Sequence, residues 1–435
     1  MTVMAKPLSH RVGQVKALAL SATAKNSGIL FAGNFLNALL AMVVVIFVSR
    51  ALGPANFGVL AVYNAVNTTL IGLTNLGLDT AAIKLISTYL DTNRRHAAVL
   101  MKSIFWIEMA CGVAVIIAGL LFSEAVAQAL GGSQLTFPVQ LAFLASAFGS
   151  AAAFIGPFFV AYQRFTANAL VGLIGGVLRL LLILVLVATV GLNLNNVLWT
   201  YTLVPIAFFF AGLALTPKDW RTKTTRAEDK AAWNEVYHFS KWILLSYIAT
   251  VLTGRLDVFL LSRFQGATQV GLYAAAIQLC SVMPILIGAI STVLLPQVSR
   301  YTHRWQFKSY IKKVSFGALV ACLVLLPVII FGQEIIQLIF GAKYNGSFTA
   351  FKIMFTGYLI ALFANPLSLV LYGLNKPAKL TIVNYVQLGV SFVLNISLIP
   401  MLGINGAAVA FLVVNAVGGI GSVWLALRIV RTVPE

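Results

Sequence analysis

Long apolar stretches, separated by short polar ones, follow one another along the whole chain. A helix needs about 20 apolar residues to cross the hydrocarbon core of a bilayer, and twelve stretches come close to that length. The polar stretches are too short for a separate soluble domain. The pattern predicts an all-α integral membrane protein with twelve transmembrane helices, near residues 27–49, 57–79, 101–122, 138–162, 167–190, 196–216, 240–262, 269–295, 313–332, 348–372, 378–400 and 405–427.

A short motif in the first half of the chain returns in the second half. The stretch SRALGPANFGVLAVY (49–63) reappears 213 residues later as SRFQGATQVGLYAAA (262–276). Each copy joins corresponding spans of a six-span unit, and six is even, so both units cross the membrane in the same sense. We therefore expect two six-helix bundles related by an axis along the membrane normal, with a cleft between them that rocking opens toward either side. The matched positions are Ser49/Ser262, Arg50/Arg263, Gly53/Gly266 and Gly58/Gly271.

The longest hydrophilic stretch, residues 216–238, lies between the sixth and seventh predicted spans. It is expected to link the two halves. The N-terminal stretch has a short apolar core interrupted by Lys16, which favours a basic helix at the membrane surface over its alternative, a cleaved signal peptide. The expected domains are a cytosolic basic pre-helix (1–25), an N-terminal six-helix lobe (26–216), a cytosolic linker (217–239) and a C-terminal six-helix lobe (240–430).

Composition agrees with a membrane protein and excludes other classes. The chain is 60% hydrophobic and 9% charged, whereas a soluble domain carries about 25% charged residues. The net charge of +19 comes from Lys and Arg in short loops rather than from one patch, so nucleic-acid binding is not expected. These basic residues gather on alternate loops, which predicts cytosolic termini. Arg50 and Arg263 fall on the opposite side, where we expect their side chains to reach outer lipid headgroups.

Three stretches resemble a known transporter family in their order and spacing. They are SRALGPANFGVLAVY…TNLGLDTAAIKLIS, LDVFLLSRFQGATQVGLYAAA…VLLPQVSRY and LYGLNKPAKL…LIPMLGINGAAVAF. The chain resembles the bacterial polysaccharide flippases of the multidrug/oligosaccharidyl-lipid/polysaccharide exporter superfamily. The resemblance implies an inner-membrane flippase that moves a polyprenyl-diphosphate-linked oligosaccharide to the periplasmic leaflet for surface polysaccharide biosynthesis. A drug or metabolite exporter and a lipid II flippase of the same superfamily remain alternatives.

The charged residues within predicted spans include Arg179, Arg255, Asp257, Glu108 and Asp79, and a charge in a span usually faces a cavity or a partner. None has a charged counterpart at the repeat offset, which favours function over packing, with structural salt bridges or interfacial positions as the alternative. Arginine matches phosphate geometry, so Arg179 and Arg255 are expected to hold the lipid diphosphate. Asp257, Glu108 and Asp79 are candidates for a coupling H⁺ or Na⁺. Arg255 and Asp257, two residues apart, are expected on different faces of one helix, with Arg179 a candidate partner for Asp257.

The second span also carries a polar stripe. Its residues are spaced by 4, 7 and 4, which places them on one helical face. Amides in lipid need a partner from another helix or from cavity water, so the stripe indicates either interhelical packing or a hydrated cleft that binds sugars. The stripe consists of Asn64, Thr68, Asn75 and Asp79, with Asn67 beside it and Asn34 and Asn37 on the first span.

The sequence shows no catalytic set. The four histidines are far apart, and no metal-ligand cluster, nucleophile elbow or phosphate loop is present. We therefore expect no cofactor and no enzyme activity, the rival being a membrane-embedded glycan polymerase or acyltransferase. The expected partners are a lipid-linked glycan, membrane lipids, the coupling ion, and the polymerase or glycosyltransferases of the same biosynthesis.

Overall fold

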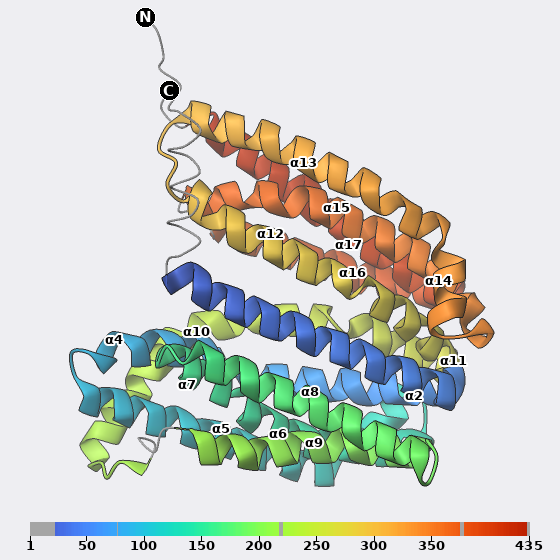
Figure 1. The fold of residues 1–435 in the computed structure, drawn as a ribbon, viewed down its shortest axis with the longest axis horizontal. Coiled ribbons are helices and arrows are strands. Elements are labelled where there is room, and N and C mark those ends of the chain that lie inside the picture. Colours follow the sequence, from blue (N-terminus) through green and yellow to red (C-terminus); the bar gives the residue numbers. More distant parts are fainter. Residues whose placement is uncertain (1–21, 76, 217–220, 375–377, 433–435) are drawn as a thin grey trace, which may run out of the picture.

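The computed structural model describes residues 22–75, 77–216, 221–374 and 378–432. These residues form helices joined by short turns, without a strand (Figure 1). The predicted pre-helix 1–25 falls almost wholly outside them. The elements are α2 (Ala22–Asn75), α3 (Leu78–Ala81), the π-helix η1 (Ala82–Ile86), α4 (Ser87–Leu90), α5 (Arg94–Leu130), η2 (Ser133–Leu135), α6 (Thr136–Ala153), α7 (Ile155–Ala161), α8 (Phe165–Ala188), α9 (Leu194–Leu215), α10 (Arg226–Thr253), α11 (Leu256–Cys280), α12 (Val282–Val298), α13 (Arg304–Ile330), α14 (Gly332–Ile339), η4 (Ala342–Ser347), α15 (Phe348–Gly373), α16 (Ala378–Leu402) and α17 (Ile404–Val430).

Ten helical stretches in the described part of the chain are long and apolar enough to span a membrane. Two of them are about twice the usual length, with 44 and 45 residues, and each contains one copy of the repeated motif. Each is broken at the motif's first glycine, Gly53 (φ 68°, ψ 173°) and Gly266 (φ 78°, ψ 173°). Positive φ favours glycine, so the same local chemistry gives the same break twice. The all-α membrane fold is confirmed, while the count of twelve crossings stays a prediction.

The two copies of the motif pack directly against each other. A Cβ atom on Gly58 would lie 1.7 Å from the carbonyl oxygen of Ala267, and one on Gly271 would lie 1.9 Å from that of Pro54. Pro54 corresponds to Ala267 and Gly58 to Gly271, each at the repeat offset of 213. Each copy therefore uses the same surface to contact the other, as in a two-fold interface. Only glycine permits this close approach of backbones.

Arg50 does not extend toward lipid headgroups, as its position in the sequence suggested. Its guanidinium donates to the carbonyl oxygens of Leu338 and, at 2.8 Å, Ile339, the last residues of α14. A cation at this position stabilises the partial negative charge of a helix C-terminus. Arg50 thus ties the first half of the chain to the second.

Two further hydrogen bonds join the halves at the same end. The Tyr344 hydroxyl donates to the backbone oxygen of Ser49 at 2.8 Å. The Ser262 hydroxyl donates to the backbone oxygen of Leu130 at 2.6 Å. Ser49 and Ser262 are matched positions of the repeat. We call this end of the molecule, formed by residues 49–58, 262–271 and α14, the hairpin end.

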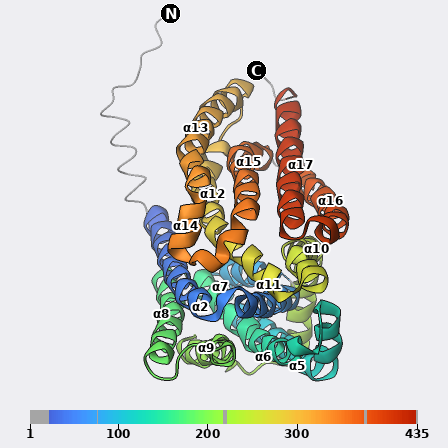
Figure 2. The ribbon, with the colours of Figure 1, turned by 90° about the vertical axis from the view of Figure 1, so that its right-hand side faces the viewer.

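The hydrophobic cores are joined at the hairpin end and separate at the other. One core runs through both halves and includes Val48, Tyr63, Tyr273 and Tyr344. At the opposite end, the first half has its own core, which includes Leu100, and the second half another, which includes Phe307. We call this opposite end, formed by the starts of α5, α10 and α13 and the end of α17, the terminal end. Figures 1 and 2 show the two groups of helices on either side of α2 and α11.

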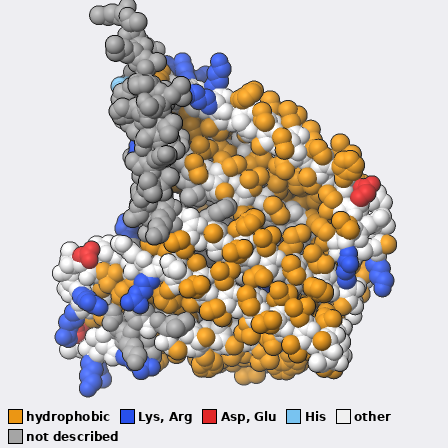
Figure 3. Space-filling model, in the orientation of Figure 1, with side chains coloured by type: hydrophobic (Ala, Val, Ile, Leu, Met, Phe, Trp, Pro, Cys, Tyr) orange, Lys and Arg blue, Asp and Glu red, His pale blue; other side chains and the backbone are white. Residues whose placement is uncertain are grey.

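The surface follows the same axis. Apolar side chains cover the flank seen in Figure 3, and Lys and Arg gather mainly at the terminal end. The predicted linker 217–239 is helical from Arg226, and this part of α10 packs on α5 through ion pairs. Hydrogen bonds to the Glu228 carboxylate lower its pKa to about 2, and the Arg95 guanidinium contributes more to this shift than Thr225 does. The ion pairs are Arg95–Glu228 at 2.9 Å, His96–Glu235 at 2.8 Å and Lys102–Asp229 at 3.5 Å.

Candidate functional site

The predicted span 240–262 is broken in its middle. α10 ends at Thr253, Gly254 and Arg255 form a turn, and α11 begins at Leu256. The carbonyl end of α10 and the amide end of α11 therefore meet inside the membrane region. Non-helical backbone at that depth is tolerated where it is buried in protein or lines a cavity. The sequence signal was a glycine beside an arginine within an apolar run.

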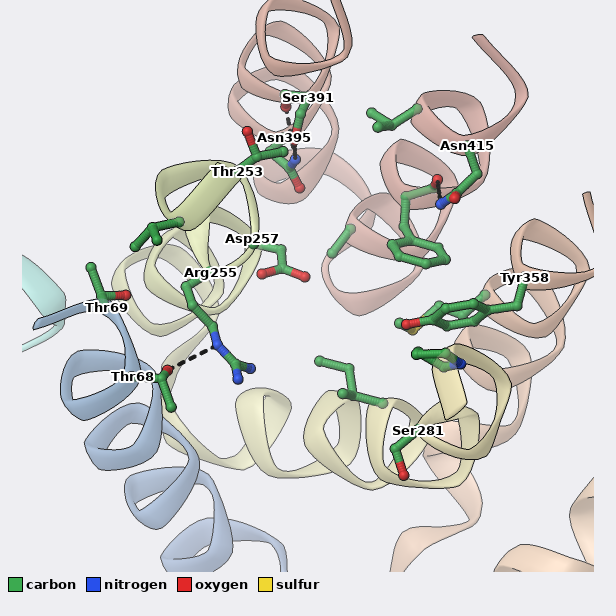
Figure 4. A pocket seen from close by; sticks show the side chains of 18 residues that line it. Thr68, Thr69, Thr253, Arg255, Asp257, Ser281, Tyr358, Ser391, Asn395 and Asn415 are labelled. Atoms are coloured by element: carbon green, nitrogen blue, oxygen red, sulfur yellow. Dashed lines mark hydrogen bonds between the residues drawn. The ribbon is translucent and has the colours of Figure 1, made fainter. Parts of the chain in front are cut away.

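A cavity of about 490 Å³ lies against this break (Figure 4). This volume is within the range of about 300–1,000 Å³ typical of ligand sites. Its wall is formed by α2, the α10–α11 break, α12, α15, α16 and α17. The polar side chains that line it are Thr68, Thr69, Thr253, Arg255, Asp257, Ser281, Tyr358, Ser391, Asn395 and Asn415.

Arg255 is the basic group of this cavity. Its Nε donates to the Thr68 hydroxyl at 3.1 Å, which fixes the side chain against α2. In the described part of the chain, no residue accepts a hydrogen bond from its two terminal amino groups, and Figure 4 shows them directed into the cavity. A half-tethered guanidinium of this kind is positioned to hold an anion by two parallel hydrogen bonds.

Asp257 lies on the same cavity wall as Arg255, not on a different face as predicted. The reason is the break, because Arg255 is in a non-helical conformation (φ −137°, ψ 0°) just before α11. Both carboxylate oxygens of Asp257 are already engaged. One accepts from the backbone N–H of Val258 at 2.8 Å and the other from the Tyr273 hydroxyl at 2.6 Å. A carboxylate in the first turn of a helix is favoured by the helix dipole.

Arg179 lies outside the cavity. Its guanidinium stacks on the Tyr201 ring at 4.9 Å, within the first half of the chain. Tyr201 in turn packs edge-on against Tyr63, whose hydroxyl bonds to Thr202 at 3.0 Å. No ion pair joins Arg179 to Asp257 in the described residues, so the suggested pairing is wrong. Its Nε is buried without a hydrogen-bond partner.

The polar stripe of the second span is divided between different environments. Thr68 reaches the cavity, whereas Asn75 is buried beside Asp79. Asn64 and Asn67 are half-buried and do not line the cavity. On the first span, Asn37 packs against Gly176 of α8 and Asn34 is exposed. A regular spacing predicted a shared helical face but not a shared cavity.

Sequence reasoning missed the wall opposite Arg255. Ser391 and Asn395 are four residues apart on α16, and Asn415 lies on α17 (Figure 4). The Asn395 amide donates to the Ser391 backbone oxygen at 2.7 Å, and its own side-chain oxygen is buried without a partner. The signal was the same as in the second span, an amide and a hydroxyl at helical spacing in an apolar run.

Glu108 and Asp79 lie elsewhere in the first half, away from the cavity lining. Within the described ranges, no group of three or more His, Cys, Asp or Glu side chains is arranged to hold a metal ion. The chemistry of the cavity is therefore one cation, one engaged carboxylate and a ring of hydroxyl and amide groups.

The comparison with protein families decides the assignment. The family model described as "Polysaccharide biosynthesis protein" matches residues 23–302, more than half of the chain. The chain belongs to this family. The match confirms the resemblance seen in the sequence and spans both copies of the repeated motif.

Two curated relatives align over most of their length. A Haloferax volcanii protein named "Probable low-salt glycan biosynthesis flippase Agl15" is 22% identical over 89% of this chain and 80% of its own. A Shigella flexneri protein named "Putative O-antigen transporter" is 23% identical over 84% of this chain and 88% of its own. An uncharacterized membrane protein of Methanocaldococcus jannaschii is 26% identical over 40% of this chain, and the match spans only 35% of that relative.

Solved structures share the fold. A structure titled as lipid II flippase MurJ in an inward closed conformation has a TM-score of 0.74 at 13% identity, covering 91% of this chain and 87% of that one. An inward-facing transporter of the multidrug resistance MATE family has a TM-score of 0.70 at 14% identity, covering 91% and 95%. At these identities the likeness concerns the fold alone.

Proposed function

We propose that the protein is a flippase that moves a polyprenyl-diphosphate-linked oligosaccharide from the cytosolic to the periplasmic leaflet of the inner membrane. Membership of the polysaccharide biosynthesis family and relatives named as a glycan flippase and an O-antigen transporter support a transporter rather than an enzyme. The cavity adds the chemistry, because it combines an anion-binding group with groups that bind hydroxyls.

The two unpartnered terminal amino groups of the Arg255 guanidinium are the observation that carries the proposal. The terminal amino groups point into a cavity at a broken helix, where low dielectric strengthens binding of an anion. A lipid diphosphate is such an anion, and its prenyl tail stays in the bilayer. Arg179 remains a second predicted phosphate contact, although its guanidinium lies on Tyr201 in this structure.

The opposite wall suits the sugar next to the diphosphate. Ser391, Asn395 and Asn415 offer amide and hydroxyl groups across the cavity from Arg255. The Asn395 side-chain oxygen is buried at this wall without a partner, so it accepts from a sugar hydroxyl once its side chain turns toward the cavity. A cavity of about 490 Å³ holds a headgroup and its first sugar rather than a whole glycan, so the rest of the chain extends out of the cavity.

Alternating access between two halves supplies the movement. We propose twelve crossings in two six-helix lobes, 26–216 and 240–430, with cytosolic termini. The joined core at the hairpin end and the separate cores at the terminal end support a state closed toward the periplasm. Rocking of the two halves would separate the packed motifs at the hairpin end and bring the two halves together at the terminal end.

One of the two alternatives predicts a different cavity. An exporter of organic cations needs a carboxylate free to pair with its substrate, whereas both oxygens of Asp257 are engaged. Flipping of lipid II, a diphosphate lipid with its own sugars, would use the same arginine. The choice between the two diphosphate substrates therefore rests on the wall formed by Ser391, Asn395 and Asn415, which we call the sugar wall.

Binding of a short-chain polyprenyl-diphosphate disaccharide to the purified protein tests the proposal. Arg255→Ala removes charge-assisted hydrogen bonds worth about 1.5–3 kcal/mol, so affinity should fall by roughly 10–150-fold. Arg255→Lys should restore only part of it, because an ammonium lacks the planar fork. Arg263→Ala, which removes an exposed arginine of α11, is the control. Equal affinity of the Arg255→Ala and control variants would refute the phosphate role.

A further inference from the structure

Tyr273 is a buried residue of α11 that the proposed function leaves without a role. It is 0% exposed and is not among the residues that line the cavity. Its hydroxyl donates to one carboxylate oxygen of Asp257 at 2.6 Å. The other oxygen of Asp257 accepts from the backbone N–H of Val258 at 2.8 Å. Tyr273 thus acts from behind the cavity wall on the carboxylate of the cavity.

The break at Gly266 brings these two groups together. Asp257 and Tyr273 are 16 residues apart in the sequence, so an unbroken helix would separate them by about 24 Å along its axis. The chain breaks between them at Gly266, where φ is 78°. The hydrogen bond shows that the two parts of α11 on either side of this glycine fold back on each other. The contact is therefore a product of the repeated motif.

The first half of the chain shows that the scaffold does not require a polar pair at this place. At the repeat offset of 213, Asp257 corresponds to Val44 and Tyr273 to Leu60. Val44 and Leu60 are each 1% exposed and belong to the apolar core that runs through both halves. Apolar side chains satisfy the packing there without burying a polar group. The pair in the second half therefore serves a need of the cavity around Arg255.

Arg255 and Asp257 would be natural partners for each other. They are two residues apart, so their Cα atoms are separated by at most about 7 Å. Both side chains line the same cavity (Figure 4), and opposite charges attract strongly where the dielectric is low. Nevertheless, no ion pair joins them in the described part of the chain. An arginine paired with a carboxylate would have fewer N–H groups left to hold a phosphate.

We infer that Tyr273 is a positioning residue, which holds Asp257 away from Arg255 and so keeps the arginine free for the diphosphate. The inference deepens the proposed function and rests on it for the identity of the anion. While both oxygens of Asp257 have donors, the carboxylate gains little by turning to the guanidinium. Loss of the Tyr273 hydroxyl leaves one oxygen without a donor, which is unfavourable for a buried charged group. Arg255, the basic side chain of the cavity wall, then takes the place of the hydroxyl.

Binding of a short-chain polyprenyl diphosphate without sugars to the full-length protein tests the inference. Tyr273→Phe removes the hydroxyl and keeps the ring. The released oxygen of Asp257 should compete for Arg255 and lower the affinity about tenfold, the smaller effect expected of one hydrogen bond to a charged group. Asp257→Asn should bind no more weakly than the wild type, alone or combined with Tyr273→Phe, because a neutral amide does not compete for the guanidinium. A merely structural role of Tyr273 would lower the affinity in both backgrounds.

Tyr310→Phe is the matched control. It removes another buried tyrosine hydroxyl of the second half, whose hydrogen bond to the backbone oxygen of Pro366 has the same length of 2.6 Å. Tyr310 belongs to the separate core at the terminal end, so its variant should bind the diphosphate as the wild type does. Equal affinity of Tyr273→Phe and Tyr310→Phe overturns the inference. A loss in Tyr273→Phe that Asp257→Asn does not reverse also overturns it.

A second measurement needs no ligand. Solid-state NMR of the protein in lipid, with isotope-labelled arginine, reports whether the terminal amino groups of Arg255 are paired, and the signal is assigned by its loss in Arg255→Lys. The signal should move in Tyr273→Phe and return when Asp257→Asn is added, whereas an unchanged signal in Tyr273→Phe overturns the inference. If the signal moves as expected but the wild type binds no diphosphate lipid, the proposed function is contradicted and the positioning of Asp257 by Tyr273 stands.

Discussion

The packing of the two repeated motifs predicts that an added methyl group will open the hairpin end. Gly58→Ala would place a carbon 1.7 Å from the carbonyl oxygen of Ala267, and Gly271→Ala would place one 1.9 Å from that of Pro54. Both obstacles are backbone atoms in helices, so no side chain can move aside. The two motifs themselves must separate.

The size of the effect follows from the geometry. A carbon approaches a carbonyl oxygen to about 3.3 Å, so the backbones must move apart by about 1.6 Å at Gly58. Overpacking of this kind costs about 1–3 kcal/mol. The cost falls on the state in which the motifs touch, so the ratio of closed to open hairpin ends should fall by roughly 5–150-fold.

Spin labels across the hairpin end measure that ratio. Gln134→Cys and Lys343→Cys, both exposed, place one label on each half, in a background without the native cysteines. Gly58→Ala and Gly271→Ala should each shift the distance distribution to longer values. The double variant should add little, because the first substitution has already separated the shared surface.

Gly317→Ala is the control, since a Cβ atom there would have no neighbour within 4 Å. If Gly58→Ala gives the same distance distribution and the same thermal stability as Gly317→Ala, the contact between the motifs does not close the hairpin end. If the effects of Gly58→Ala and Gly271→Ala on the distance distribution add fully, the two contacts are independent, contrary to the reciprocal packing.

Two further predictions concern the terminal end and the sugar wall. The folded-state pKa of Glu228 is about 2, below the value of about 4.3 for an unperturbed Glu. The stability that the Glu228 carboxylate contributes to docking of α10 is thus fully present above the unperturbed pKa of about 4.3 and is lost as the pH falls through about 2. A spin label attached at Lys230→Cys should become mobile over this acidic range. In the Glu228→Gln background, the same label should be mobile already at neutral pH. A label that stays immobile in that background at neutral pH would exclude the ion pair as the anchor. Asn395→Ala should lower the affinity for the diphosphate-linked disaccharide about fivefold, which corresponds to the loss of one hydrogen bond. The affinity for a diphosphate lipid without sugars should not change. An equal loss of affinity for both ligands would remove Asn395 from sugar recognition.

Much of the scaffold was predictable because its physical signals are local. Apolar runs of spanning length predicted the helices, and the repeated motif predicted two equivalent connections between spans, which the structure forms as breaks within long helices at Gly53 and Gly266. Gly58 was noted only as a repeated position, and its nearest neighbour in the structure is the backbone oxygen of Ala267 in the other copy of the motif. A repeat in sequence predicts equivalent structures, while the contact between them depends on how the two units fold together.

The candidate site was predictable only in part. Arg255 and Asp257 were recognised by the cost of a charge in a span, and both line the cavity. Their relative orientation was wrong because an ideal helix was assumed across residues 240–262, where the chain breaks at Gly254. Arg179 was recognised by the same cost, but an aromatic ring meets it instead of the cavity. The free-energy cost of burying a charge shows that the charge needs a partner, but it does not show which partner the fold provides.

The unrepeated charges separate two tasks within a repeated scaffold. The position equivalent to Asp79 is Ser291, whose hydroxyl bonds to Asn365 at 3.0 Å, so the second half satisfies its polar group there by a neutral contact. The position equivalent to Arg255 is Met42. A packing requirement of the scaffold would appear in both halves, since both units build the same break at Gly53 and Gly266. We therefore propose that Arg255, the cavity cation of the second half, serves binding rather than packing, and that Asp79 of the first half, which also lacks a charged counterpart, stays a candidate for ion coupling.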